Sequence, residues 1–323
     1  MELFLEHPKN ECLSQTSPFK ARWHIVFLIT DTNISKNYSK LIHKDSFIIE
    51  AGEKNKNLET YLLILKKIPP NTDTIVAFGG GVVGDIAGFI SSTFKRGIRL
   101  INIPTSLLAM VDSSIGGKNG VNLGEYKNFI GTFYNPSEVL IDCLFLKSLP
   151  EKEIKVGIAE IIKYSYLFGM PSYKEVISIM NSDINIEKVI YKSCKAKIEV
   201  VIKDPDDENY RHILNFGHTI GHAIELLYDL SHGEAISIGM AKESELGVNQ
   251  GLISEEKYQE LIGVLRNLGL PRDFPPNFNA EKVFDIMKAD KKGEFIFALS
   301  KDNYAIKINN EKIISFLKKH NPI

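Results

Sequence analysis

The stretch Thr74-Ile-Val-Ala-Phe-Gly-Gly-Gly-Val-Val-Gly-Asp85 decides the fold of the first half of this chain. Residues Thr74–Phe78 form an apolar run typical of a buried strand, and a helical pattern follows the glycines. Gly79, Gly81 and Gly84 match the GxGxxG spacing at which backbone N–H groups approach a pyrophosphate. The stretch therefore predicts a nucleotide-binding α/β unit, although the same glycines would also suit a purely structural tight turn.

Further apolar, β-rich runs alternate with helical segments on both sides of this stretch. They predict strands at His24–Thr30, Ser46–Ile49, Thr74–Phe78, Arg99–Ile103 and Glu138–Ile141, and a helix around Leu58–Lys67. Such alternation indicates a parallel sheet covered on both faces. A strand before His24 is expected to be reduced, because the chain begins only a short way upstream.

The pattern changes after Pro150. From Glu151 to about Arg266 the apolar residues recur with helical spacing and β-branched runs are nearly absent, so this half should be helical. A short tail, Glu294–Lys307, alternates enough to form a small hairpin. We therefore expect two domains, residues 1–150 and residues 151–323.

Composition excludes several classes of protein. The 323 residues carry 39 Lys+Arg against 40 Asp+Glu, a net charge of −1, which argues against a nucleic-acid-binding protein with a basic face. No apolar run reaches the ~20 residues of a membrane span, and residues 1–20 lack the apolar stretch of a signal peptide. Cys12, Cys143 and Cys194 form no CxxC pair, so we expect reduced thiols in a cytoplasmic enzyme.

The glycine turn is an atypical dinucleotide fingerprint. The acidic residue expected about 20 positions downstream is missing, and Asp31 and Glu53 are the acids that could hold ribose hydroxyls instead. A second loop, Asp112–Gly120, combines glycines with Lys118, and Lys127-Asn128 follows shortly after. This composition suits a phosphorylated ligand, and the alternative is a flexible surface loop with solvated lysines.

Four polar residues share one face if the stretch after Tyr210 is a single helix. At about 100° per residue, Arg211, Asn215, His218 and His222 fall within roughly 60° of one another. Gly217 and Gly221 interrupt this stretch, which indicates that something approaches its backbone closely. Four of the eight histidines lie between His212 and His232, and such clustering favours a metal site over isolated core or surface histidines.

A catalytic divalent metal often takes two histidines and one carboxylate. Several carboxylates could serve, and we select Glu160, because it lies among apolar residues of a predicted helix and needs a cationic partner. The predicted ligands are Glu160, His218 and His232; the alternative for Glu160 is a local ion pair with Lys163. Positive side chains would surround this metal and favour a substrate that carries phosphate and carboxylate groups: Lys118, Lys127, Lys163, Lys197 and Arg211.

Seven motifs together resemble the 3-dehydroquinate synthases of the sugar phosphate cyclase family. They run over nearly the whole chain, from about Asp31 to Lys292: GGGVVGDIAGF, FKRG, IPTSLLAMVDSSIGGK, YKNFIG, GIAEIIK, NFGHTIGHAIE and SHGEAISIGM. The resemblance implies an N-terminal NAD-binding α/β domain with a parallel sheet, an all-α metal-binding C-terminal domain, and a homodimer.

The resemblance also implies roles for individual residues. Positions matching NAD contacts are Asp31, Asn33, Glu53, Lys56, Gly80, Gly81, Val82, Asp85, Thr105, Ser106, Asp112, Ser113 and Lys127. Glu160, His218 and His232 match the ligands of Zn²⁺ or Co²⁺. Positions matching substrate contacts are Lys118, Asn128, Lys163, Lys197, Arg211, Asn215, His222, Lys291 (in preference to Lys292) and Arg96, the last of which would reach in from a neighbouring subunit.

The implied reaction converts DAHP, a seven-carbon sugar-acid phosphate, to 3-dehydroquinate in the shikimate pathway of aromatic amino acid biosynthesis. NAD oxidises a metal-held hydroxyl, phosphate is eliminated, the ketone is reduced again, and an aldol step closes the ring. The residues implied to be catalytic in this lyase reaction include Lys118, Lys163 and His222. Cations would hold the leaving phosphate, and His222 would be a positioned acid or base. Asp207 stands where the family carries a glutamate proton shuttle, and Pro205 would bend the approach to it.

Three other readings remain open. The first is another sugar phosphate cyclase, acting on glucose 6-phosphate or sedoheptulose 7-phosphate, although Asn128, Asn215 and His222 match the 3-dehydroquinate synthases. The second is a metal-dependent polyol dehydrogenase of the same fold, which would not need the surrounding cations. The third is a binding module without catalysis, supported only by the altered Asp204–Tyr210 segment.

Overall fold

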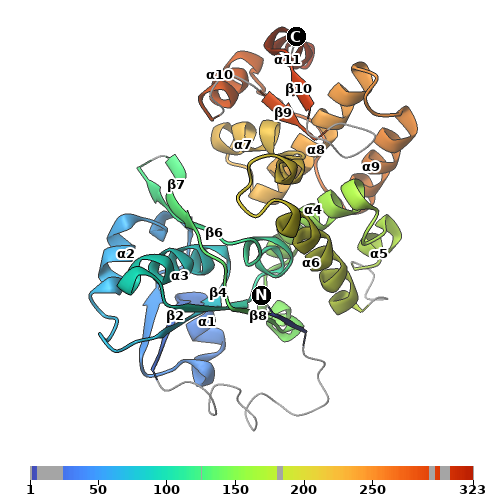
Figure 1. Ribbon diagram of the computed structural model, residues 1–323. Coiled ribbons are helices and arrows are strands. Elements are labelled where there is room, and N and C mark those ends of the chain that lie inside the picture. Colours follow the sequence, from blue (N-terminus) through green and yellow to red (C-terminus); the bar gives the residue numbers. More distant parts are fainter. Residues whose placement is uncertain are drawn as a thin grey trace. The chain divides into compact units, whose positions relative to one another are not determined.

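The chain divides into two compact units, Met1–Ile154 and Lys155–Ile323. The computed structural model describes residues 2–5, 25–124, 126–179, 185–290, 295–298 and 306–322 (Figure 1). The first unit is an α/β structure built on a parallel sheet, and the second is mainly helical, as the sequence predicts. Among the described residues we find no helix with the length and apolarity that a membrane crossing requires.

A parallel sheet forms the centre of the first unit. In order across the sheet, its described strands are β1 (Glu2–Leu5), β8 (Glu138–Ile141), β5 (Arg99–Pro104), β4 (Thr74–Gly79), β2 (Val26–Asp31) and β3 (Ser46–Ile49). The five predicted strands all form, and their ends differ from the prediction by at most a few residues. The strand β1 precedes them and pairs with β8, so an N-terminal strand is present.

Apolar side chains cover both faces of this sheet. Every residue of β4 is buried, as expected for a central parallel strand. On one face, Ile75 packs with Ile64 of α2 (Leu58–Leu65) and with Ile86 of α3 (Gly81–Thr93). On the other face, the ring of Phe78 lies 5.2 Å from the ring of Phe145. The glycine turn between β4 and α3 is therefore held by a sheet that is packed on both sides.

A two-stranded antiparallel ribbon follows the sheet strand β5. It consists of β6 (Lys118–Leu123) and β7 (Tyr126–Phe133), and the sequence reasoning interpreted its first part as a loop. Short helical segments complete the unit: α1 (Thr32–Asn37), η2 (Ser39–Leu41), η3 (Glu53–Asn55), η4 (Phe94–Arg96), η5 (Ala109–Ser113) and η6 (Cys143–Ser148).

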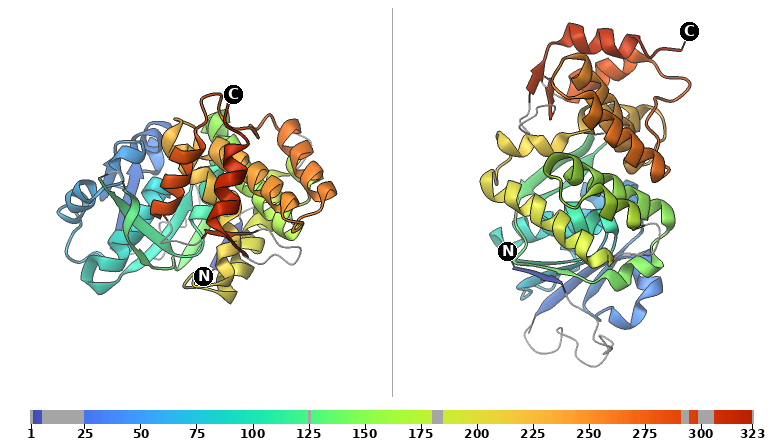
Figure 2. Two further views of the ribbon diagram at one scale, coloured as in Figure 1. Left: turned by 90° about the horizontal axis from the view of Figure 1, so that it is seen from above. Right: turned by 90° about the vertical axis from the view of Figure 1, so that its right-hand side faces the viewer.

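Helices make up most of the second unit. They are α4 (Glu151–Phe168, which begins in the first unit), α5 (Tyr173–Ser178), α6 (Ile186–Lys203), η7 (Tyr210–Asn215), α7 (His218–Leu227), α8 (His232–Asn249), α9 (Glu255–Asn267), α10 (Ala280–Asp290) and α11 (Asn310–Lys318). The strands β9 (Phe295–Phe297) and β10 (Ile306–Ile308) pair antiparallel, which agrees with the predicted hairpin. At the C-terminal end, α10 and α11 lie side by side (Figure 2). The Glu281 carboxylate and the Lys318 ammonium form an ion pair at 3.0 Å.

Candidate functional site

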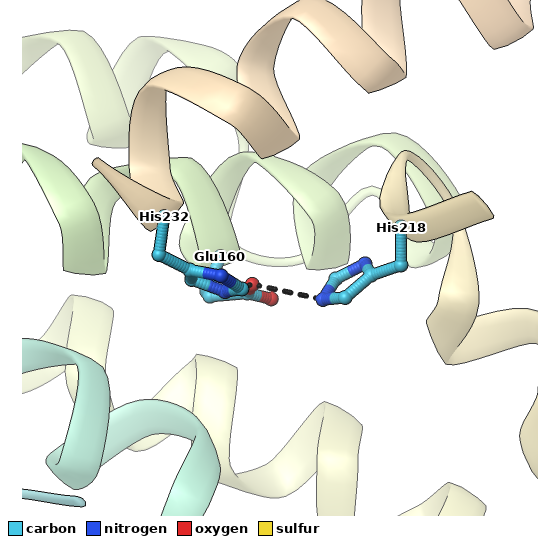
Figure 3. A group of neighbouring side chains, drawn as sticks. All are labelled: Glu160, His218 and His232. Atoms are coloured by element: carbon cyan, nitrogen blue, oxygen red, sulfur yellow. Dashed lines mark hydrogen bonds and ion pairs between the residues drawn. The ribbon is translucent and has the colours of Figure 1, made fainter. Parts of the chain in front are cut away.

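Glu160 is a buried acid at the centre of a group of polar side chains in the second unit. It lies on α4 and is 1% exposed. One carboxylate oxygen, Oε2, lies 2.5 Å from the Lys163 ammonium nitrogen. The other, Oε1, faces Nε2 of His218 at 3.3 Å and Nε2 of His232 at 3.2 Å (Figure 3). A carboxylate removed from water in this way requires compensating positive charge.

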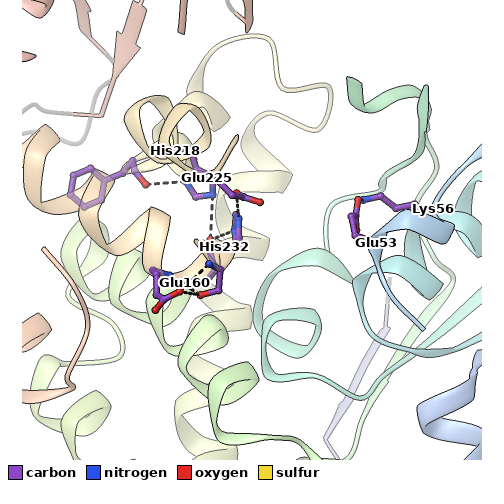
Figure 4. Close-up of polar contacts among 9 residues, drawn as sticks. Glu53, Lys56, Glu160, His218, Glu225 and His232 are labelled. Carbon is purple, nitrogen blue, oxygen red and sulfur yellow. Dashed lines mark hydrogen bonds and ion pairs between the residues drawn. The ribbon is translucent and has the colours of Figure 1, made fainter. Parts of the chain in front are cut away.

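The partners of the two imidazoles fix which nitrogen of each ring faces Glu160. Nδ1 of His218 lies 3.0 Å from the Phe216 carbonyl oxygen, and Nδ1 of His232 lies 3.0 Å from the Glu225 carboxylate (Figure 4). Both partners are acceptors, so Nδ1 of each ring carries the proton and donates it. In the neutral rings, both Nε2 lone pairs therefore point at a carboxylate oxygen, and this arrangement is repulsive until a cation lies among the three groups.

The donor set of Glu160, His218 and His232 fits a divalent transition metal. Their ligating atoms lie within 4.8 Å of one another. Two imidazole nitrogens and one carboxylate oxygen suit zinc or cobalt and leave coordination positions open for a substrate. Each histidine also has the outer hydrogen bond that normally orients a metal-ligating imidazole.

The pKa values of Glu160 and His232 are shifted by the charged groups around them. Burial lowers the pKa of His232, but its contacts with Glu160 and Glu225 outweigh burial and raise it to about 9. Burial raises the pKa of Glu160, but the Lys163 ammonium and the His218 ring hold it well below its usual value. Without metal, a proton on His232 thus supplies positive charge beside the ionised carboxylate.

The predicted single helix over Arg211–His222 is wrong. Tyr210–Asn215 is a short 3₁₀ helix, Gly217 is left-handed with φ of 79°, and α7 begins only at His218. A Cβ on Gly217 would lie 2.5 Å from Met240 Cγ, so the glycine is required where this turn meets α8. The expected close approach to this backbone is thus provided by α8.

Glu225 is a site residue that the sequence reasoning missed. With His222 and His232 it forms a second group whose possible ligand atoms lie within 4.8 Å of one another. Glu225 follows His218 and His222 at spacings that place all three on one face of α7. That spacing was a usable signal, but only the fold brings Glu225 to Nδ1 of His232.

The residues predicted to contact substrate in the second unit differ in how far they are buried. Lys163, Lys197 and Arg211 are at most 5% exposed, whereas Asn215 is half-buried and His222 is exposed. The His222 ring lies 5.2 Å from that of His218. Lys163 contacts Glu160 directly. Buried lysine side chains are uncommon without an anionic partner, and Glu160 is such a partner for Lys163.

The unusual segment before Arg211 forms a compact turn. The Asp204 carboxylate accepts hydrogen bonds from the backbone N–H groups of Arg211, Asn209 and Glu208, and these lower its pKa to about 2. Pro205 lies in this turn, and its carbonyl accepts a hydrogen bond from the Arg211 guanidinium at 3.0 Å. Asp207 is left-handed with φ of 58° and half-buried.

The glycine turn of the first unit, between β4 and α3, leaves its backbone accessible to a bound ligand. A Cβ on Gly80 would lie 3.4 Å from Ser106 Oγ, and one on Gly81 would lie 3.3 Å from Ser113 Oγ. The predicted cofactor residues Thr105, Ser106 and Ser113 therefore lie beside the turn, and the Thr105 N–H binds the Gly79 carbonyl. Gly80 precedes α3 and makes no side-chain cap, so no side chain of its own covers the N–H groups of the first turn, which are those that can bind a phosphate.

Three further predicted cofactor residues form an ion cluster. Lys56 is 6% exposed, and its ammonium nitrogen lies 2.9 Å from Glu53 Oε1 (Figure 4). The same nitrogen lies 3.1 Å from Asp85 Oδ2. Burial lowers the pKa of Lys56, but the charges of Asp85 and Glu53 outweigh it and raise the pKa. Asp31 instead caps α1, where it accepts hydrogen bonds from the N–H groups of Asn33 and Ile34.

The other predicted residues of the first unit lie on exposed or half-buried backbone. Lys118 is exposed at the start of β6, and Lys127 and Asn128 are exposed on β7. Arg96 is exposed at the end of η4. Two further predicted residues, Val82 in the first turn of α3 and Asp112 in η5, are half-buried. The predicted substrate residue Lys291, with its neighbour Lys292, lies outside the described residues.

Comparison with known sequences shows one family over most of the chain. A family model described as 3-dehydroquinate synthase N-terminal matches residues 46–156, and one described as 3-dehydroquinate synthase C-terminal matches residues 157–293. The 3-dehydroquinate synthase of Thermoanaerobacter pseudethanolicus is 40% identical over 287 residues, 82% of this chain and 80% of that protein. That of Streptococcus mutans is 41% identical over 288 residues, 83% of this chain and 81% of that protein.

Solved structures of related enzymes share the fold. A 2-deoxy-scyllo-inosose synthase complexed with carbaglucose-6-phosphate, NAD⁺ and Co²⁺ is 25% identical, with a TM-score of 0.79 over 92% of this chain and 91% of that one. The 2-epi-5-epi-valiolone synthase of Streptomyces hygroscopicus, with NAD⁺ and Zn²⁺ bound, is also 25% identical, with a TM-score of 0.79 over 98% of this chain and 96% of that one. A glycerol dehydrogenase from Schizosaccharomyces pombe, 15% identical with a TM-score of 0.64 over 93% of this chain and 84% of that one, shares the fold alone.

Proposed function

The chain belongs to the 3-dehydroquinate synthase family, and we propose that it converts DAHP to 3-dehydroquinate and phosphate as a carbon–oxygen lyase. The observation that carries the proposal is the convergence of Glu160, His218 and His232 on one point of the second unit. The 3-dehydroquinate synthases are 40% and 41% identical to this chain, against 25% for the solved 2-deoxy-scyllo-inosose synthase, and this supports the choice of DAHP as substrate.

Each of the two units would bind one of the two proposed cofactors. Residues 1–150 would bind NAD at the turn formed by Gly80 and Gly81, beside Ser106 and Ser113. Residues 151–323 would hold Zn²⁺ or Co²⁺ through Glu160, His218 and His232. When bound, the metal supplies a Lewis acid for the substrate hydroxyls and NAD accepts and returns a hydride.

Protein side chains would bind the substrate and move its protons. We assign the carboxylate and phosphate of DAHP to cationic and amide groups, namely Lys118, Lys163, Lys197, Arg211, Asn128, Asn215 and Lys291. The His222 imidazole, exposed beside His218, would hold or accept a proton of a substrate hydroxyl. Asp207 would serve the same proton transfer from its turn.

We further propose that the enzyme is a cytoplasmic homodimer. Exposed apolar side chains that lie together are typical of an interaction surface. The exposed rings of Tyr126 and Phe129 lie 5.4 Å apart on the β6–β7 ribbon, which also exposes Leu123 and Phe133. In such a dimer the exposed Arg96 would contact substrate bound to the partner. Sedimentation equilibrium of the purified chain tests the dimer.

Phosphate release tests the assigned substrate. With NAD and Co²⁺ present, we expect release from DAHP but not from glucose 6-phosphate or sedoheptulose 7-phosphate. Chelation of the metal should abolish it, and no NADH should accumulate because the cofactor is regenerated. Release from one of the other phosphates would identify a different cyclase, and net NADH from glycerol-like alcohols would identify a dehydrogenase.

A matched pair of variants tests the metal ligands. Glu160 and Glu175 each pair with a lysine, but Glu175 lies on the short helix α5, contacts Lys192 and belongs to neither group of possible metal ligands among the described residues. Glu160→Gln should reduce phosphate release by more than the roughly 100-fold that loss of an outer partner costs. Glu175→Gln should leave release unchanged; an equal loss in both variants would contradict the assignment of Glu160 as a ligand.

A further inference from the structure

The start of α7 has a cap that its own sequence neighbours do not provide. Helices begin with N–H groups that lack intrahelical partners, and a side chain at the preceding residue usually accepts from them. Here that residue is Gly217, which has no side chain. The Gly217 N–H instead donates to Glu243 Oε2 at 2.8 Å, and the Ile220 N–H donates to Glu243 Oε1 at 3.1 Å.

Close packing of α7 against α8 makes this contact possible. Glu243 lies in the middle of α8 and is completely buried. A Cβ on Gly239, one turn earlier, would lie 1.9 Å from the Gly217 carbonyl oxygen. The two backbones therefore touch at glycine, and the Glu243 side chain spans the short remaining distance to the N–H groups of α7.

The same contact determines where a predicted metal ligand lies. His218 is the first residue of α7, between the two amides that Glu243 binds. His232 is the first residue of α8, about three helical turns before Glu243. The helix α8 thus carries the predicted ligand His232, and through Glu243 it also fixes the start of α7, which carries the predicted ligand His218.

We propose that Glu243 is a positioning residue that sets the place of His218 Nε2 relative to Glu160 and His232. This inference rests on the metal site assigned under the proposed function. An ionised carboxylate is favoured at a helix N-terminus, and it can accept hydrogen bonds with both of its oxygens. A glutamine of the same size keeps one acceptor oxygen and turns an N–H₂ group towards the other N–H, so it should loosen the start of α7.

Cobalt binding to the metal-free full-length chain tests the role of Glu243. For Glu243→Gln we expect the dissociation constant of Co²⁺ to rise at least about tenfold, as when other orienting partners of ligands are lost. The visible absorption bands of bound Co²⁺ should also change, because they report the geometry of the ligands. In turnover, kcat should fall more than KM rises, because the metal rather than substrate affinity is disturbed.

Ser237 provides the matched control. It is also completely buried on α8, and its hydroxyl donates to the Pro271 carbonyl at 2.6 Å rather than to α7. Ser237→Ala should lower the melting temperature of the metal-free chain but leave the Co²⁺ affinity and spectrum unchanged. Equal weakening of Co²⁺ binding in both variants, or unchanged binding in Glu243→Gln, would overturn the proposal.

Two further measurements distinguish a failure of the role assigned to Glu243 from a failure of the proposed function. If the unaltered chain binds Co²⁺ and releases phosphate from DAHP while Glu243→Gln behaves identically, only the role of Glu243 is refuted. If Glu243→Gln does not fold, amide hydrogen exchange of the unaltered, metal-free chain decides. Protection of the Gly217 and Ile220 amides is expected before any metal is added, and rapid exchange of both would overturn the proposal.

Discussion

His232 makes two contacts that determine how the site takes up a metal. Its Nδ1 binds the Glu225 carboxylate and its Nε2 faces Glu160. These acids raise its pKa from an ordinary 6.5 to about 9, so the metal-free chain holds an additional proton between these values. The stabilisation from that proton is complete below pH 6.5 and is lost as the pH rises through about 9.

Metal binding must displace this proton, because only the neutral ring is a ligand. At pH 7.5 we expect about one proton to be released per Co²⁺ bound, and the apparent affinity to increase with pH up to about 9. Calorimetry in buffers of different ionisation enthalpy counts these protons. Glu225→Gln should release fewer protons and bind Co²⁺ roughly 10–100-fold more weakly; binding without proton release in the unaltered chain would contradict the assignment.

The contact between α8 and the turn before α7 requires a glycine at position 239 of α8. Gly239→Ala would put a methyl group 1.9 Å from the Gly217 carbonyl, so we expect the free energy of unfolding to fall by about 1–3 kcal/mol. Co²⁺ affinity should fall with it. Gly263→Ala on α9 is the control, because a Cβ there meets nothing within 4 Å and should stabilise the helix by about 1 kcal/mol. Urea unfolding measures both, and equal effects would contradict the close contact.

Elements with one dominant local signal could be predicted from the sequence. The runs around Ile75 and Ile101 are β-prone and become buried strands. The β6–β7 ribbon could not be predicted, because Gly120 and Gly131 resemble loop residues. In the structure they are needed for strand contact, since a Cβ on Gly131 would lie 2.3 Å from the Asn119 carbonyl. Glycine composition alone does not distinguish these two cases.

The identities of the candidate metal ligands could be predicted from the sequence, but the local structure that positions them could not. Glu160, His218 and His232 could be selected because a buried acid and clustered histidines require a cation. The end of the helical stretch before His218 could not be predicted. It depends on a left-handed Gly217 and on hydrogen bonds from the start of α7 to Glu243, which lies 26 residues later in the chain. Tertiary contacts of this kind leave no spacing pattern in the sequence.

At the scale of the whole molecule, the two proposed cofactors should stabilise different units. The metal ligands all lie within Lys155–Ile323, and the glycine turn lies within Met1–Ile154. Co²⁺ alone should slow amide exchange in α4, α7 and α8, and NAD alone should slow it in the turn before α3. At 100 times Kd, each ligand should contribute about 2.7 kcal/mol. Slowing of the turn by Co²⁺ alone would contradict this separation.

The order of strands in the sheet also has a consequence for synthesis. The strand β1 is made first, yet it pairs with β8, the last strand of that sheet along the chain. At about 5–20 residues per second on the ribosome, β1 waits several seconds for its partner to emerge. Of the described strands, β1 waits longest for its partner, so we expect a bulky domain inserted directly before β1 to lower the yield of folded chain.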